Sequence, residues 1–108
     1  MARFPCPYLG GEVELTDERE RHIAETHPDL LPEHRDRIVG TLADPDRVRR
    51  SARFATARLF ERWYDDLRGG KHVVVVAVTE NGPTGRHWIV TAYLARKLAE
   101  GEVEWKRS

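Results

Sequence analysis

The chain has 108 residues and a mass of 12.5 kDa, with 18 basic and 18 acidic side chains and no formal net charge. This length fits one domain, residues 1–108, and a hydrophobic content of 40% provides for one folded core, which excludes a disordered chain. The neutral balance argues against a uniformly basic nucleic-acid-binding protein, and no apolar run approaches the length of about 18 residues that crosses a membrane.

The charges are distributed unevenly along the chain. Residues 1–46 contain five basic and eleven acidic side chains, whereas residues 47–108 contain thirteen basic and seven acidic ones. In the stretch 47–62, six arginines are opposed by one carboxylate, Glu61. This asymmetry indicates either a surface for a polyanion or a fold in which the acidic half covers the basic half.

The cysteine content and the N-terminal region bear on the cellular compartment. Cys6 is the one cysteine, so no intramolecular disulfide forms, and we expect it to be a packing residue. The N-terminal region also lacks the apolar run of a signal peptide. We therefore expect a cytoplasmic protein that makes no membrane contact.

Two helices are predicted in the N-terminal half. The first covers 17–27: Asp17 is the expected N-cap, Glu20 completes a capping box, and Pro28 ends the helix. The second covers 32–42, because proline is favoured at the first helical position and the segment carries an apolar stripe at helical spacing.

The remainder of the chain is typical of β-structure. Alternating or β-branched segments separated by turn sequences predict strands at 47–54, 57–64, 72–79, 87–94 and 102–105, the last a short edge strand. The β-branched run 72–79 suits a central strand covered on both faces. Helices followed by consecutive strands predict an α+β fold, with two N-terminal helices packed on one face of a four- to five-stranded antiparallel sheet.

Alternation along strand 87–94 predicts which side chains face the helices. We expect the apolar set to pack there and the opposite set to form a polar surface; the first is Trp88, Val90, Ala92 and Leu94, and the second is His87, Ile89, Thr91 and Tyr93. The polar surface either receives a ligand or is an ordinary solvated face of a sheet.

Strand 57–64 carries basic and aromatic residues on one face, namely Arg58, Phe60, Arg62 and Tyr64. If this face joins Thr91 and Tyr93, the sheet presents guanidinium groups for phosphates and rings for unpaired bases. The alternative is that Arg58 and Arg62 form surface ion pairs with nearby carboxylates, which are Glu61, Asp65 and Asp66.

The sequence contains no motif for a metal or a nucleotide cofactor. His22 and His27 are five residues apart, about 140° round a helix, whereas two ligands from one helix usually come three or four residues apart. Gly69-Gly70-Lys71 lacks the remaining residues of a phosphate-binding loop. We therefore expect neither a metal nor a cofactor.

Several short motifs share their order and spacing with a known group of proteins. They are Val13-Glu14-Leu15-Thr16, His22-Ile23, His27-Pro28, Asp44-Pro45-Asp46 with Val48, Leu59-Phe60 with Trp63-Tyr64, Val73–Val78 and Thr91-Ala92-Tyr93. With these motifs the chain resembles, over about residues 12–105, the phage-type branch of the barnase–EndoU–colicin–RelE nuclease superfamily. The resemblance implies N-terminal helices on a four-stranded antiparallel sheet and metal-independent cleavage of RNA, often by a toxin.

The implied reaction is attack of a ribose 2′-hydroxyl on the neighbouring phosphorus, which needs a general base, a general acid and fixed positive charge. The candidate residues are His22 and then His27 for proton transfer, Arg58 and Arg62 for the phosphate, Thr91 for positioning, and Tyr93 for stacking or proton donation. Weaker candidates are Lys71, His72 and His87.

Both helical histidines also have structural interpretations. His22 lies one turn after Glu18 and can pair with it, and His27 lies at a helix C-terminus, where the helix dipole favours a cation. The function predicted on the resemblance is an endoribonuclease that is toxin-like or phage-derived, with RNA as substrate and an inhibitory protein as partner. The alternatives are a non-catalytic RNA- or protein-binding module of the same fold, or a homodimer formed through strand 102–105 with Trp105 as its anchor.

Overall fold

The computed structural model describes residues 1–80, 85–98 and 102–108. Within these residues two α-helices, one short 3-10 helix (Pro7–Leu9) and seven strands are formed. The helices are α1 (Asp17–Thr26) and α2 (Arg35–Ala43). The strands are β1 (Ala2–Cys6), β2 (Gly11–Leu15), β3 (Arg47–Arg50), β4 (Ala57–Tyr64), β5 (Lys71–Thr79), β6 (His87–Ala95) and β7 (Val103–Lys106).

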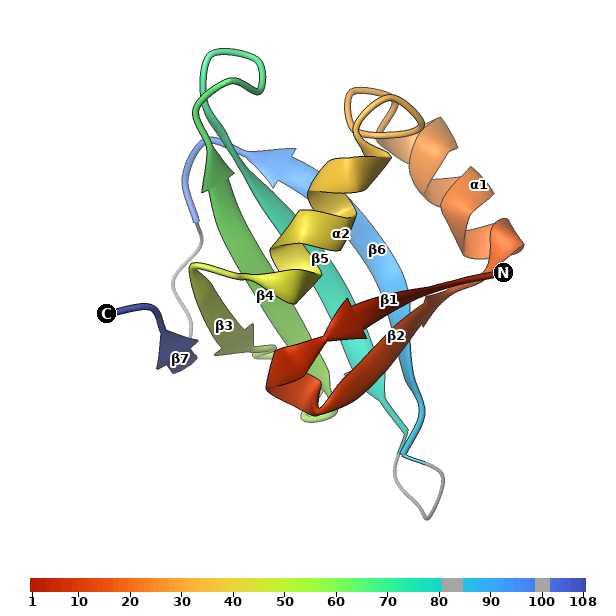
Figure 1. Ribbon diagram of the computed structural model, residues 1–108, viewed down its shortest axis with the longest axis vertical. Helices are drawn as coiled ribbons and strands as arrows, with labels where there is room; N and C mark the ends of the chain where they lie inside the picture. The colour runs from red at the N-terminus through yellow and green to blue at the C-terminus, as the bar shows by residue number, and fades with distance from the viewer. Residues whose placement is uncertain (81–84, 99–101) are drawn as a thin grey trace.

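The strands of the described chain form one seven-stranded sheet in the order β1-β2-β6-β5-β4-β3-β7 (Figure 1). The fold is therefore α+β, but the sheet is larger than predicted, and it is mixed rather than antiparallel because β2 pairs in parallel with β6. The additional strands are the N-terminal hairpin β1–β2, where Cys6 is fully buried, as expected of a packing residue. Strand β7 lies at the opposite edge, as predicted for its segment.

Helix α1 agrees with its prediction to within one residue at the C-terminus, but its N-cap is different. The hydroxyl of Thr16, rather than the carboxylate of Asp17, accepts a hydrogen bond from the backbone N–H of Arg19 at 3.1 Å. The carboxylate of Asp17 instead binds the N-terminal ammonium group at 2.9 Å. Glu20 forms no capping box, since it pairs with Arg35 at 2.8 Å.

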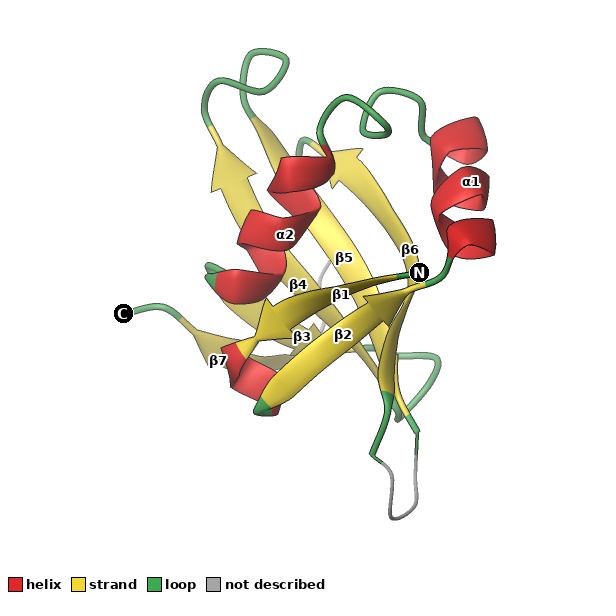
Figure 2. Ribbon diagram, turned by 45° about the vertical axis from the view of Figure 1, so that its right-hand side comes forward, coloured by secondary structure: helices red, strands yellow, loops and turns green. Residues whose placement is uncertain are grey.

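Helix α2 begins at Arg35, three residues after the predicted start at Pro32, which lies in a turn. Its apolar residues Ile38 and Leu42 are fully buried against the sheet. Figure 2 shows α2 lying across one face of the sheet. Helix α1 instead lies beside β6, along the part of that strand that β2 does not pair with. The two helices therefore do not share one face as predicted.

The position of α1 follows from the short pairing between β2 and β6, which involves only the residue pair Glu14 and Trp88 among the described residues. Beyond this pair the chain turns into α1, which takes the place of a neighbouring strand. The Arg19 guanidinium donates to the carbonyl of Val90 at 3.5 Å, and Ile23 is the fully buried residue of the helix. The helix thus covers the edge of β6.

The face of the sheet opposite α2 is called the open face below. Its residues are Arg47 and Arg49 of β3, Leu59, Glu61 and Trp63 of β4, His72, Val74, Val76 and Val78 of β5, and Trp88, Thr91 and Tyr93 of β6. This assignment follows from the strand register, because directly paired residues lie on the same face. The core lies on the other face, between the sheet and α2, around Phe60, Val73 and Val75.

A bulge changes the faces of β6. The register shifts between Val76 and Ala77, so that these neighbours pair with Thr91 and Ile89 and leave Val90 as the extra residue. Ile89 is consequently buried in the core, although the alternation placed it on the polar face. Trp88 moves to the open face for the same reason, whereas Thr91 and Tyr93 lie opposite the core as predicted.

Among the described residues, neither helix has the length or apolarity that crossing a lipid bilayer requires.

Candidate functional site

A cavity of about 530 Å³ opens on the open face, at the end of the sheet where β4 ends and β5 begins. Its walls combine sheet residues with the segment that follows β6. The lining residues are Asp46, Arg47, Glu61, His72, Arg96, Lys97, Leu98 and Lys106. Figure 1 shows the described start of this segment, directly after β6, passing the end of β4, and its residues Arg96, Lys97 and Leu98 line the cavity.

The floor of this open-face cavity is a buried carboxylate between two guanidinium groups. Glu61 is fully buried and Arg49 is 5% exposed. Arg47 Nε donates to one carboxylate oxygen of Glu61 at 2.9 Å, and Arg49 Nε donates to the other at 2.8 Å. Both oxygens of Glu61 are therefore engaged, and the two arginines are held in fixed positions.

Three cations surround the opening of the cavity: Arg96, Lys97 and Lys106, called the rim cations below. All three are exposed, and none has a carboxylate within ion-pair distance among the residues that the structure describes. The acidic lining residues are already paired, Glu61 with the β3 arginines and Asp46 with Arg107 at 3.5 Å. The cavity thus carries an excess of positive charge and suits an anion.

His72 lies in the wall of the cavity at the beginning of β5. Burial lowers the pKa of its imidazole below the usual value of 6.5; Arg47 lowers it further, while Glu61 and Asp46 oppose the shift. The ring is therefore neutral near pH 7 and able to accept a proton. Its ring centroid lies 4.8 Å from that of Trp63, with an angle of 66° between the planes.

The register places Arg58 and Arg62 on the α2 side of the sheet, opposite Thr91 and Tyr93. The predicted surface of arginines joined to Thr91 and Tyr93 is therefore wrong. The reason is the alternation of side chains along β4. Phe60 lies in the core, and Arg58 and Arg62, each two residues from Phe60, lie on the same face as Phe60.

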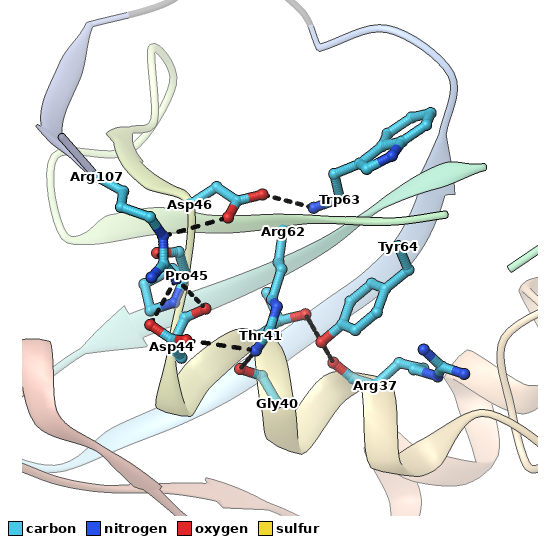
Figure 3. A network of polar contacts seen from close by, with 10 residues as sticks. All are labelled: Arg37, Gly40, Thr41, Asp44, Pro45, Asp46, Arg62, Trp63, Tyr64 and Arg107. Carbon is cyan, nitrogen blue, oxygen red and sulfur yellow. Dashed lines mark hydrogen bonds and ion pairs between the residues drawn. The ribbon is translucent and has the colours of Figure 1, made fainter. Parts of the chain in front are cut away.

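Arg62 stabilises the C-terminal end of α2 instead of forming a phosphate site. Its guanidinium donates to the carbonyl of Gly40 at 3.3 Å and lies 3.8 Å from the carboxylate of Asp44. Figure 3 shows Arg62 and Tyr64 pointing toward α2 and Trp63 pointing away from it, and the Tyr64 hydroxyl donates to the carbonyl of Arg37 at 3.2 Å. Cations near the last carbonyls of a helix interact favourably with its dipole.

Arg58 is also occupied by an ion pair. Its Nε donates at 2.7 Å to the carboxylate of Glu104 on β7, which accepts a further hydrogen bond from Tyr8 at 2.7 Å. The expected surface ion pair thus exists, but its acid comes from β7 rather than from Glu61, Asp65 or Asp66. Arg58 links β4 to the edge strand.

The remaining sequence candidates are dispersed. His22 is exposed on α1, away from the cavity lining. His27 contacts Tyr93, with 6.0 Å between the ring centroids, and burial raises the pKa of the Tyr93 phenol. Thr91 lies on the open face one row farther from the cavity than Tyr93. These residues do not converge on one cleft with Arg58 and Arg62.

The other two weaker candidates, His87 and Lys71, do not line the cavity that contains His72. His87 accepts or donates one hydrogen bond with the Thr79 hydroxyl at 2.9 Å, at the far end of β5. Lys71 binds the backbone carbonyl of Arg68 at 2.9 Å, on the α2 side of the sheet. His72 is therefore the histidine that the structure brings to the cavity.

Sequence reasoning missed Glu61, Arg47 and Arg49 as residues of one cluster. The sequence did contain an indication of this cluster. Glu61 is the one acid within the arginine-rich stretch 47–62, and it lies in a strand that also contains Leu59, Phe60 and Trp63. Pairing β3 with β4 was needed to show that Arg47 lies directly opposite Glu61.

The described residues contain no group of three or more histidine, cysteine or acidic side chains placed to hold a metal ion. Comparison of the chain with family models, with curated proteins and with solved structures gives no match.

Proposed function

We propose that the chain is a metal-independent endoribonuclease that acts in the open-face cavity. The observation that carries the proposal is the position of a neutral histidine, His72, beside a cavity with an excess of guanidinium and ammonium groups. RNA cleavage by its own 2′-hydroxyl needs a proton acceptor and positive charge around the phosphorus, and both are present here.

In the proposed reaction the imidazole of His72 accepts the proton of the 2′-hydroxyl. The 2′-oxygen then forms a bond to phosphorus, and the bond from phosphorus to the 5′-oxygen breaks. The leaving oxygen takes a proton from water at the open rim, so the products are a 2′,3′-cyclic phosphate and a 5′-hydroxyl. Arg47 and the rim cations stabilise the charge that develops on the phosphate oxygens, so the proposed step uses side-chain charges where other nucleases use a metal ion.

Glu61 has a positioning role in this proposal. Its two oxygens are both hydrogen-bonded to arginines, which leaves it a poor proton acceptor but fixes Arg47 at the cavity floor. A charge that is held in place before the substrate arrives requires no reorganisation during the reaction.

The test is cleavage of a single-stranded RNA oligonucleotide in the presence of EDTA by the wild-type protein and by His72→Ala. We expect the wild type to release a cyclic phosphate, and we expect His72→Ala to lose about 100-fold or more of kcat, as for removal of a general base. His87→Ala is the matched control, because His87 also lies on a strand and also has a pKa lowered by burial, but lies outside the cavity lining.

Two further controls separate this proposal from the arginine site expected from the sequence. Arg58→Met and Arg62→Met remove cations that point to the α2 side of the sheet, so both variants should retain cleavage within about twofold. Equal activity of wild type and His72→Ala, or loss of cleavage in EDTA, contradicts the proposal.

A non-catalytic module that binds single-stranded RNA is the second candidate. The engagement of both Glu61 oxygens favours it, because the cavity then offers no free carboxylate to act with His72. Binding of RNA by the wild-type protein without any cleavage product supports this alternative.

A further inference from the structure

We propose that Trp63 is a base-stacking residue, and that the cavity consequently selects a nucleotide whose base is unpaired. This inference deepens the ribonuclease proposal and rests on it for the identity of the ligand. Three observations carry it: the indole is exposed, it is held in one orientation, and it lies next to the cationic cavity.

Trp63 is exposed although it lies on β4, which is an interior strand of the sheet. The residue is 41% exposed, whereas Val74 on the neighbouring strand and the same face is 1% exposed. A tryptophan that only completes the core would be covered. The exposed ring surface is therefore available to another flat, apolar group.

The indole is nevertheless fixed from three sides. The indole Nε1 donates to the carboxylate of Asp65 at 2.5 Å. The backbone N–H of Trp63 also donates to the carboxylate of Asp46, at 2.7 Å (Figure 3). The ring lies over Gly70, where a Cβ atom would be only 2.5 Å from Cζ2, and its third neighbour is the imidazole of His72. A ring held in this way loses little conformational freedom when a base stacks on it.

The surroundings of Trp63 favour a nucleotide over other flat ligands. The indole contacts His72, and His72 lines the cavity together with Arg47 and the rim cations, so an aromatic surface adjoins an anion site on the open face. A nucleotide has the same arrangement, a flat base joined through a sugar to a phosphate. Stacking on an aromatic side chain requires that the base be free of its helical neighbours, so a single strand fits and a duplex does not.

The chain contains a matched control for Trp63. Trp105 on β7 is 39% exposed, but its ring packs against Tyr8 at 6.2 Å on the α2 side of the sheet and lines a different cavity. A nonspecific effect of removing an exposed tryptophan should therefore appear equally in Trp63→Leu and Trp105→Leu.

The experiment measures binding to a single-stranded DNA oligonucleotide, which has no 2′-hydroxyl and cannot be cleaved by the proposed reaction. By fluorescence anisotropy we expect Trp63→Leu to weaken binding about tenfold or more, Trp63→Phe to retain most of the affinity, and Trp105→Leu to bind within about twofold of wild type. Replacing one nucleotide at a time by an abasic residue should weaken wild-type binding at one position and leave Trp63→Leu unaffected there. Equal binding by Trp63→Leu and wild type, or an abasic effect that persists in Trp63→Leu, overturns the inference.

Cleavage kinetics distinguish failure of this inference from failure of the ribonuclease proposal. If the protein cleaves RNA, Trp63→Leu should raise KM with little change in kcat, and unchanged KM overturns the stacking role alone. If the protein binds the DNA strand through Trp63 but His72→Ala and wild type are equally inactive on RNA, the stacking role stands and the ribonuclease proposal fails.

Discussion

At the scale of single residues, the strongest functional signal is a histidine whose charge state depends on its surroundings. His72 and His87 both have a pKa below the usual 6.5, chiefly because burial disfavours the imidazolium ion. They differ in position, since His72 lines the open-face cavity and His87 bonds to Thr79. The lowered pKa bears on the proposed reaction only at His72, whereas at both histidines it bears on the stability of the fold.

The stability should therefore decrease as the pH falls below about 6.5. The unfolded chain takes up protons on these imidazoles near their usual pKa, whereas the folded protein takes them up only at lower pH, so acidification favours unfolding. Urea unfolding between about pH 7.5 and pH 5.5 should show this decrease, and His72→Asn and His87→Asn should each flatten it. An unchanged slope in both variants contradicts this assignment. If His72 is the general base, cleavage should also decrease over this range in the wild type.

At the scale of elements, β3 is held to β4 by charge as well as by backbone pairing. Val48 is its one residue in the core, while Arg47 and Arg49 are joined to the buried carboxylate of Glu61 on the other face. Since β7 pairs with β3, the same contact indirectly supports the wall of the cavity that contains Lys106.

Glu61→Gln should destabilise the protein by about 3 kcal/mol or more, because it removes the negative charge of a fully buried carboxylate that is paired with Arg47 and Arg49. Glu14→Gln provides the control: Glu14 pairs with the exposed Arg86 at 3.0 Å, and loss of this solvent-screened pair should destabilise the protein far less than Glu61→Gln does. Chemical unfolding measures both differences. A Glu61→Gln variant as stable as Glu14→Gln shows that the pair on β3 and β4 contributes little.

The elements differ in how far the sequence determines them. The strands β4, β5 and β6 agree with prediction to within one residue at each end, because long β-branched and aromatic runs leave few alternatives. The N-terminal strand β1 was missed since Phe4-Pro5-Cys6-Pro7 contains two prolines, which are tolerated only at a sheet edge such as the one it forms. The start of α2 was placed too early because Pro32 is equally favourable in a turn.

The candidate site was less predictable than the strands, for two physical reasons. The bulge at Val90 reverses the faces of part of β6, and alternation within a single strand contains no sign of it. The cluster around Glu61 depends on contacts between β3, β4 and the segment after β6, which are set by register and by the path of a connection. The sequence therefore showed which charged residues are present but not which of them contact one another in the cavity.

At the scale of the whole molecule, the acidic and basic halves partly neutralise one another. Contacts between acids of the first half and bases of the second include Glu14 with Arg86 at 3.0 Å and Asp44 with Arg62 at 3.8 Å. The rim cations remain unpaired within the described part of the chain. The zero net charge therefore coexists with a localised positive region on the open face.

Binding of single-stranded nucleic acid should consequently depend on salt in a limited way. With three rim cations contacting phosphates, the logarithm of the association constant should fall with the logarithm of salt concentration with a slope of about −2. Lys97→Met should reduce this slope by about 0.7, whereas Lys71→Met, whose amine bonds to a backbone carbonyl, should not change it. A slope near zero excludes the rim cations as phosphate contacts.

The connection from β6 to β7 also has a consequence for the order in which the site is assembled. Chains are synthesised from the N-terminus, so His72 and Glu61 emerge from the ribosome before Arg96, Lys97 and Lys106. The cationic wall forms only when β7 has paired with β3, which requires nearly all of the described chain. A nascent chain therefore carries an incomplete site until Lys106 has emerged, and before that point Arg47 is present at the cavity without all three rim cations.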